Sequence, residues 1–308
     1  QIPEFEKAVV FFKQAIEKDP NYALAYSGLA DTYGLFPRYG DFRPKEYMPQ
    51  AKAAALKALE LDPNLAEAHT SLAQIELFYE YDFTGAEKSF KRAIELDPNY
   101  ATARQWYGLL LIYIGKNDES VREAKKAFEL DPFSLRINSD LFSSLANANR
   151  FDEALLQNKK LNELFPNEGR FHQGNFRIYA DQGKYDQAVE EFLLSVKADK
   201  DFKPENITRM KDAYGKGGWD GFQRMFGEIL LEELNARQAK DPNGYISAGE
   251  FANAYAWGKN KEKTIEYLNK AYDERDRRMM NLKADKDLDF VRDDPRFKEL
   301  VKRVGIPE

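Results

Sequence analysis

Small and apolar residues recur along the first two thirds of the chain at fixed distances from a series of prolines. The prolines that anchor this pattern are Pro20, Pro63, Pro98, Pro132 and Pro166. Five residues before them stand Ala15, Ala58, Ala93, Ala127 and Leu161, and twelve residues before them stand Ala8, Ala51, Ala86, Ser120 and Ala154. Small side chains at this spacing share one helix face and let a second helix approach closely. The pattern therefore predicts helices packed in pairs.

The spacing of the prolines gives the length of the repeating unit. Successive prolines lie 43, 35, 34 and 34 residues apart. A period near 34 residues is typical of a solenoid built from helix-turn-helix units. Because proline cannot sit inside a helix, each one marks the end of one helix and the start of the next. Residues 94–103 are nearly identical to residues 16–25 and 59–68, because each segment encodes the same turn between two helices.

The residues after each proline show which solenoid this is. Nine and ten residues beyond the first three prolines come Leu29 with Ala30, Leu72 with Ala73, and Tyr107 with Gly108. The whole pattern resembles the tetratricopeptide repeat, in which helix A carries aromatic, leucine and small positions and helix B ends in proline. The resemblance implies an all-α, right-handed superhelical solenoid of antiparallel helix pairs with about seven units. It covers residues 1–200, divided into a half unit at 1–20 and units ending near 63, 98, 132, 166 and 200.

The last third of the chain, residues 201–308, continues the repeat in a degenerate form. Residues 203–222, KPENITRMKDAYGKGGWDGF, lack the repeat proline and predict an atypical helix pair. Residues 245–272 restore the pattern with another pair. The ending DDPRFKELVKRVG, residues 293–305, predicts a C-terminal helix that caps the last apolar face. We expect the whole segment to belong to the same solenoid.

Two departures from the repeat lie near the start of the chain. Residues 34–47, GLFPRYGDFRPKEY, stretch one unit by nine residues, and their proline and glycine predict a projecting loop. The first unit holds only the second helix of a pair. Since an uncapped solenoid would expose an apolar face, we expect the natural protein to continue upstream of residue 1.

Longer stretches carry a closer resemblance. PKEYMPQAKAAALKALELDPNLAEAHTSLA at residues 44–73, GGWDGF at 217–222 and LDFVRDDPRFKELVKRVGIP at 288–307 are similar to the C-terminal repeat region of a bacterial family. In that family the repeats follow a winged-helix DNA-binding domain, a serine-threonine kinase domain or a cyclase domain. The resemblance implies an accessory sensing or scaffold region of a larger regulatory protein, such as a transcriptional regulator or a signal transduction protein.

Composition excludes several classes of function. A net charge of −6 argues against binding nucleic acid or an anionic membrane surface, both of which favour a basic face. The longest apolar run, residues 106–114, is less than half of the roughly 20 residues that a membrane helix needs. The absence of cysteine removes disulfides, thiolate nucleophiles and cysteine-based zinc sites. The compartment stays open, with the cytoplasm favoured.

The sequence offers no convincing catalytic, metal or cofactor site. His69 and His172 are the only histidines, they are three repeats apart, and both stand at a helix position typical of packing. The glycines of GKGGWDG, residues 215–221, lack the spacing of a phosphate-binding loop and predict a tight turn. The mixed charges of residues 274–286, ERDRRMMNLKADK, indicate a solvated helix end. We therefore expect no enzyme activity, metal or cofactor.

The strongest candidate site is a concave groove lined by the first helix of each pair. Positions seven and eleven after each proline project into such a groove, one helical turn apart. Aromatic residues a further turn along would add anchors of the kind that binding surfaces favour. The candidate residues are Ser27, Asp31, Thr70, Gln74, Phe78, Gln105, Leu109, Tyr113, Ser139, Ser143, Gln173 and Arg177.

Two hypotheses of function remain open. The first is a non-catalytic module that binds a peptide or a partner domain in the concave groove. The second is a structural scaffold that forms homo-oligomers and holds an N-terminal effector domain, with no external ligand. Repeat domains that clamp chaperone C-terminal carboxylates use Lys and Asn at the groove positions, and neither residue occurs there. The sequence therefore argues against that class of partner.

Overall fold

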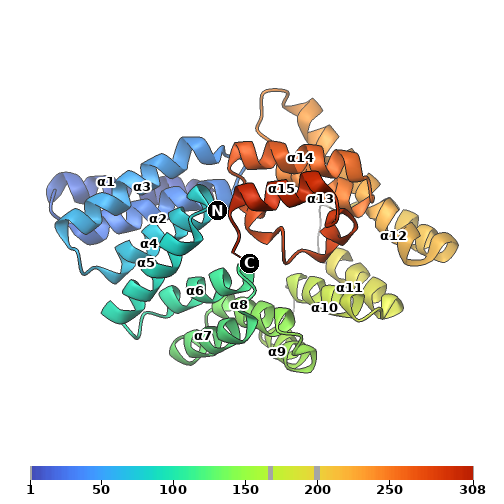
Figure 1. Ribbon diagram of the computed structural model, residues 1–308, viewed down its shortest axis with the longest axis horizontal. Coiled ribbons are helices and arrows are strands. Elements are labelled where there is room, and N and C mark those ends of the chain that lie inside the picture. Colours follow the sequence, from blue (N-terminus) through green and yellow to red (C-terminus); the bar gives the residue numbers. More distant parts are fainter. Residues whose placement is uncertain (1, 166–168, 198–201, 308) are drawn as a thin grey trace.

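The computed structural model describes residues 2–165, 169–197 and 202–307, and these ranges contain helices but no strand (Figure 1). The helices of the repeats are α1 (Ile2–Lys18), α2 (Ala23–Tyr39), α3 (Pro44–Leu61), α4 (Ala66–Ile75) with the π-helical turn η1 (Glu76–Glu80), α5 (Phe83–Leu96), α6 (Ala101–Tyr113), α7 (Asn117–Leu130), α8 (Leu135–Asn147), α9 (Phe151–Leu164), α10 (Arg170–Asp181) and α11 (Tyr185–Lys197). They are followed by α12 (Pro204–Lys240), α13 (Ala248–Trp257), α14 (Lys261–Glu274), the 3₁₀ turns η2 (Arg277–Asn281) and η3 (Lys286–Val291), and α15 (Pro295–Val304).

The repeated Asp-Pro-Asn motif forms the same turn each time. In the first three copies the aspartate accepts a hydrogen bond from the backbone N–H two residues later, as Asp62 does from Asn64 at 2.9 Å. The N–H of this aspartate also closes the preceding helix, with Asp62 donating to the carbonyl of Ala58 at 2.8 Å. Helices accordingly end two residues before Pro20, Pro63, Pro98 and Pro132. Pro166 lies outside the described residues.

The small residues of the pattern lie between paired helices. Ala58, Ala93 and Ala127 have no exposed surface, and Leu161 at the same position of α9 is 1 % exposed. The residues about two turns earlier in these four helices are fully buried as well, and they are Ala51, Ala86, Ser120 and Ala154. Because these side chains are short, neighbouring helices pack at close range and each pair buries its apolar face against the next. The described residues form seven such pairs after α1.

An atypical pair does follow residue 200, but its two halves span Pro204–Lys240 and extend well beyond the predicted residues 203–222. The chain reverses sharply inside α12, because Gly218 adopts a φ of 58° and a ψ of −148° between two helical halves. Gly221 then packs so close to the first half that a Cβ there would lie 2.3 Å from the carbonyl oxygen of Ala213. Arg209 and Glu232 pair across the two halves at 2.7 Å. Glycine is required here for conformation and for space.

The predicted loop at residues 34–47 is wrong in part. Helix α2 continues through Pro37 to Tyr39, so only residues 40–43 connect it to α3. Phe36, Phe42 and Tyr47 contact one another, with ring centroids 4.7 to 5.2 Å apart, and this aromatic contact stabilises the extra helical turn. The inserted residues therefore lengthen a helix instead of projecting as a loop.

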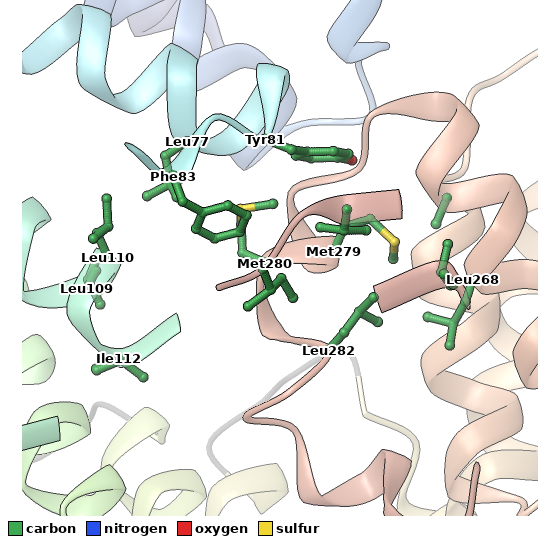
Figure 2. Close-up of a cluster of buried hydrophobic side chains, with 14 of the residues drawn as sticks. Leu77, Tyr81, Phe83, Leu109, Leu110, Ile112, Leu268, Met279, Met280 and Leu282 are labelled. Atoms are coloured by element: carbon green, nitrogen blue, oxygen red, sulfur yellow. The ribbon is translucent and has the colours of Figure 1, made fainter. Parts of the chain in front are cut away.

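The chain ends by crossing its own concave side. We call residues 275–294, which connect α14 to α15, the C-terminal arm. Figure 2 shows Met279, Met280 and Leu282 of this arm between side chains of η1, α5 and α6 on one side and Leu268 of α14 on the other. Met279 and Met280 are fully buried. The prediction of a solvated helix end at residues 274–286 is therefore wrong.

Polar contacts of Tyr81 and Arg237 fix this closure. The hydroxyl of Tyr81 donates to the carbonyl oxygen of Asp276 at 3.0 Å, and Arg237 pairs with Asp41 at 2.9 Å and with Glu250 at 2.8 Å. As a result the C-terminal helices α13 to α15 lie beside the second and third pairs, so that the red and cyan segments adjoin in Figure 1. The predicted capping helix is α15, which buries Phe297, Leu300 and Val304 in the same core.

The all-α solenoid of antiparallel pairs is thus confirmed, while the right-handed sense of the superhelix stays a prediction. None of the helices within the described ranges is both long and apolar enough to cross a bilayer.

Candidate functional site

The C-terminal arm divides the predicted groove into a filled middle and two open ends. In the middle, Leu109 is 7 % exposed and belongs to the core around Met280. Tyr113 packs against the edge of the same core. Gln105 is buried and donates to a carboxylate oxygen of Asp140 at 2.7 Å. These three predicted residues therefore serve internal packing in this structure.

Two further predicted residues are buried near the first end of the groove. Ser27 places its hydroxyl 3.3 Å from that of Ser71, and Thr70 donates to the carbonyl of Ala66 at 2.9 Å. Both are 1 % exposed. The hydroxyl of Ser27 thus meets a polar group across the contact between α2 and α4, and that of Thr70 bonds within α4.

The remaining predicted residues of this end line a cavity of about 370 Å³, which we call the arginine pocket. Its walls come from α2, α4, η1, residues 40–44, and the segments 245–250 and 275–278. Asp31, Gln74 and Phe78 lie in it. The pocket also contains four arginines from two parts of the chain, which are Arg38, Arg275, Arg277 and Arg278.

Asp31 lies in this pocket at the contact between α2 and α4. Its carboxylate accepts a hydrogen bond of 2.6 Å from the hydroxyl of Ser71. Burial raises the pKa of Asp31 to about 6, because the charged form loses hydration that the single hydroxyl replaces only in part. Near neutral pH the carboxylate is therefore ionised at a cost to folding.

The opposite end of the groove is a wider depression of about 660 Å³, which we call the polar hollow. Ser139, Ser143, Gln173 and Arg177 all lie in it, so the structure brings four predicted residues together here. Its other walls include the amides of Asn147, Asn149, Asn253 and Asn281 and the ring of Trp257.

Some side chains of the polar hollow form hydrogen bonds or ion pairs within the chain, and others do not. Ser139 and Ser143 donate to backbone carbonyls one turn earlier in α8. Arg177 pairs with Asp287 of the C-terminal arm at 2.5 Å and stacks on Trp257 at 4.9 Å. The Asp287 carboxylate raises the pKa of Arg177 against the opposing effect of lost hydration. Gln173 is exposed.

The indole N–H of Trp257 is an unusual feature of this hollow. The side chain is 2 % exposed, and its nitrogen has no hydrogen-bond partner among the described residues. A buried donor without an acceptor costs about 1–3 kcal/mol, so most such groups find a partner. The wall of the hollow thus contains a buried donor that the described residues leave without an acceptor.

Comparison with known proteins agrees with this architecture. Residues 177–202 match the family model described as "Tetratricopeptide repeat". The chain therefore has the fold of a tetratricopeptide repeat (TPR) solenoid. It resembles PilF of Pseudomonas aeruginosa with a TM-score of 0.51 and 19 % identity, covering 74 % of this chain and 94 % of that one. It resembles yeast Tom70 with a TM-score of 0.51 and 18 % identity, covering 97 % and 62 %. These two likenesses show the fold.

A curated relative comes from bacterial regulation. The transcriptional regulator HilA of Salmonella typhimurium is 30 % identical over 117 residues, and the same match is found in Salmonella typhi. The matched segment is 38 % of this TPR chain and spans 21 % of the length of HilA. The likeness is therefore confined to a part of that regulator.

The histidines take no part in either end of the TPR groove. His69 places a ring nitrogen 3.0 Å from the carbonyl oxygen of Pro63, and His172 lies 2.6 Å from a carboxylate oxygen of Glu191. Within the described residues, no group of three or more potential ligands could hold a metal ion.

Sequence reasoning missed the residues that come from outside the regular TPR positions. Arg38 lies in the inserted segment, Arg277 in the C-terminal arm, and Trp257 at the end of α13. The arginines could have been predicted from the segments that depart from the repeat, because both the insertion and residues 274–286 are rich in arginine.

Proposed function

We propose that this chain is a non-catalytic protein-interaction module that binds an extended peptide of a partner protein in the polar hollow. A TPR fold implies a protein-protein interaction module in general. The observation that supports this particular surface is the unpartnered Trp257 N–H beside four groove residues, Ser139, Ser143, Gln173 and Arg177.

The chemistry of the hollow suits a peptide backbone. Serine hydroxyls and asparagine or glutamine amides can each donate and accept, so they can pair with backbone C=O and N–H groups in turn. Phe142 and Phe226 add apolar surface for a side chain of the peptide.

Charge at the hollow favours a peptide without strong net charge. Arg177 is paired with Asp287, and Lys286 is paired with Asp181 at 2.8 Å. Because these charges are balanced within the chain, an acidic or basic peptide gains little from them.

We further propose that the module is part of a larger bacterial regulatory protein. The partial likeness to HilA and the similarity of residues 44–73 and 288–307 to regulator tails support this setting. In this proposal residues 201–308 belong to the same solenoid as residues 1–200, the module works in the cytoplasm, and nucleic acid is bound elsewhere in the protein.

The test is selection of binding peptides from a random library, followed by a comparison of variants. Ser143→Tyr with Gln173→Glu fills and charges the polar hollow, and we expect it to weaken selected peptides at least tenfold. Gln14→Glu makes the same chemical change on the exposed face of α1 and should bind normally. Equal binding by the wild-type chain and both folded variants would refute the proposed site.

The variant pair avoids Gln105, although it occupies the same repeat position as Gln173. Because Gln105 donates to buried Asp140, a glutamate there would disturb folding and obscure any loss of binding.

A scaffold that self-associates is the second candidate. Helix α1 contains no buried residue, and it exposes Val10 by 50 % and Phe11 by 66 %. Exposed apolar side chains of this size can form a contact between two copies of the chain. Light scattering decides between the candidates, because self-association raises the mass with concentration and Phe11→Ser should abolish the rise.

A further inference from the structure

The arginine pocket carries positive charge that the part of the chain described by the structure does not neutralise. Among the described residues, neither Arg38 nor Arg277 forms an ion pair or a side-chain hydrogen bond to a carboxylate. The acidic groups that line the same pocket are already engaged. Asp41 and Glu250 both pair with Arg237, and Asp276 pairs with Arg278 at 3.0 Å.

The two remaining charged groups of the pocket are held by contacts other than ion pairs. Asp31 is held by Ser71, and the guanidinium of Arg275 stacks on the rings of Tyr81 and Tyr272 at 5.0 and 5.6 Å. Asp140 lies outside the pocket but interacts electrostatically with Arg38. It is paired with Arg136 at 3.1 Å. Arg38, Arg275 and Arg277 therefore have no carboxylate partner among the described residues, and of these Arg38 acts directly on the charge of Arg277.

The geometry of Arg38 leaves its hydrogen-bonding edge available. Its guanidinium lies over the ring of Trp106 at 4.6 Å and near that of Phe78 at 5.6 Å. Stacking holds the flat face of a guanidinium, while its N–H groups point outward in the plane and match the two oxygens of a carboxylate or phosphate. The aromatic rings thus fix an arginine to which no carboxylate of the described residues is bound.

Arg277 reaches the same space from the C-terminal arm. Loss of hydration at the pocket lowers the pKa of Arg277, and the like charges of Arg38 and Arg278 lower it further. Burial raises the pKa of Tyr113, and Arg38 and Arg277 both oppose this rise, so both guanidinium groups lie near its hydroxyl. An anion between the two arginines would relieve their repulsion.

Much of the remaining wall of the pocket is apolar. Leu35, Pro37, Met48, Ile75 and Phe78 all line it. A cavity of about 370 Å³ falls within the range of small-molecule sites, which are mostly apolar with a few polar groups that fix orientation. A free inorganic ion would leave most of this wall uncovered.

We propose that the arginine pocket binds a small organic anion, with its carboxylate or phosphate between Arg38 and Arg277 and its apolar body against Phe78 and Ile75. This site is separate from the polar hollow and does not depend on peptide binding there. Because its two arginines come from α2 and from the C-terminal arm, the anion would also hold the arm against the first repeats.

The experiment uses phenylacetate and phenyl phosphate as probes and phenylacetamide as the neutral analogue. Each is titrated into the full chain by ligand-observed NMR. We expect at least one anion to bind with a dissociation constant on the order of 1 mM, as suits a ligand of this size, and the amide at least tenfold more weakly. The preferred anion distinguishes a carboxylate from a phosphate ligand.

Variants then locate the binding. Arg38→Met and Arg277→Gln should each weaken the preferred anion at least tenfold, and Arg38→Lys should weaken it less than Arg38→Met does. Arg209→Met removes a surface arginine of α12 and should leave the affinity within twofold. Circular dichroism checks that each variant is folded. Arg277 is exposed to solvent on one side, so the loss of its side chain should disturb little packing.

Two outcomes would overturn the proposal. One is an anion that binds the wild-type chain no more tightly than the amide does. The other is binding that survives unchanged in both Arg38→Met and Arg277→Gln. Loss of peptide binding in the Ser143 and Gln173 variant affects neither outcome, so the two proposals fail independently.

Discussion

Gln105 and Gln173 occupy the same position in two repeats, yet they lie in different environments. Gln105, in the middle of the concave side, is buried and hydrogen-bonded to Asp140. Gln173, at one end, is exposed in the polar hollow. The repeat sets the direction in which both side chains point, whereas their exposure depends on what the rest of the chain places in front of them. The same repeat position therefore carries a structural role in one unit and an accessible surface in another.

The cause of this difference is the C-terminal arm. Met279 and Met280 fill the concave side opposite α6. At either end the arm leaves a cavity. A regular solenoid with six or more pairs would offer one continuous groove. Here the groove is divided into two hollows of different chemistry, one rich in arginine and one in neutral polar groups.

The largest effect should come from removing the contact that separates the two ends. Met280→Ala deletes a fully buried side chain of the arm, and we expect it to lower the free energy of unfolding by about 2–5 kcal/mol. Urea denaturation followed by tryptophan fluorescence measures this change. Leu24→Ala, at a leucine that is 46 % exposed, is the control and should cost less than about 1 kcal/mol. Similar costs for both would show that the arm is not a firm part of the core.

The matched glutamines provide the next test. Gln105→Glu puts a second carboxylate beside buried Asp140 and should cost about 3 kcal/mol at pH 7. Gln173→Glu should change the stability by less than about 0.5 kcal/mol, because its side chain faces water. Chemical denaturation measures both, and lowering the pH should reduce the cost of Gln105→Glu, since protonation of one carboxyl removes the repulsion. Equal effects at the two positions would contradict the comparison.

Asp31 allows the arginine pocket to be tested by pH. Its pKa is raised from 3.8 to about 6, so the folded chain binds this proton more tightly than the unfolded chain does. The carboxyl therefore costs stability as the pH rises from about 4 to 6, and the cost is constant above that range. Asp31→Asn should stabilise the fold by about 1–3 kcal/mol at pH 7.5, since an amide oxygen still accepts from Ser71. The gain should shrink toward zero near pH 4.

Comparing chemical denaturation of wild type and Asp31→Asn at about pH 7.5 and pH 4 checks this prediction. A gain of the same size at both values would mean that the amide acts through packing and not through the lost charge.

The smallest effect concerns the ion pair that joins the polar hollow to the arm. Arg177→Ala leaves the mostly buried carboxylate of Asp287 without its cation and should cost about 1–2 kcal/mol. Lys286→Ala removes a more exposed pair with Asp181 and should cost less than about 1 kcal/mol. Thermal unfolding of both variants ranks the two pairs, and the reverse order would show that burial of Asp287 is unimportant.

Local sequence patterns predicted most of the fold. Repeated Asp-Pro-Asn turns and small residues such as Ala58 and Ala93 fix helix ends and close packing within about 34 residues, so they can be recognised without any distant contact. The reversal at Gly218 was also predictable, because only glycine fits that backbone and the approach of Gly221 to Ala213. Each of these features depends on interactions between neighbours along the chain.

The candidate site could be predicted only in part, for a physical reason. The repeat placed Gln173 and Arg177 together correctly, since helical geometry alone decides it. It could not show that Leu109 would be covered, because the covering residue, Met280, lies in a distant part of the sequence. The charges around Met280 suggested solvent exposure, while the arm leaves Arg277 exposed and buries the methionines that follow it. Contacts over such distances leave no periodic signal.

Because the two ends of the chain pack together, the fold can be completed only late in synthesis. Tyr81 and its partner Asp276 are 195 residues apart, and Arg237 and Asp41 are 196 residues apart. The first repeats leave the ribosome long before the arm is synthesised. Their apolar concave face around Leu77 therefore stays uncovered until the last part of the polypeptide has emerged. A nascent chain that stops before the arm would present that face to the cell, and chaperones would meet it as an exposed apolar surface.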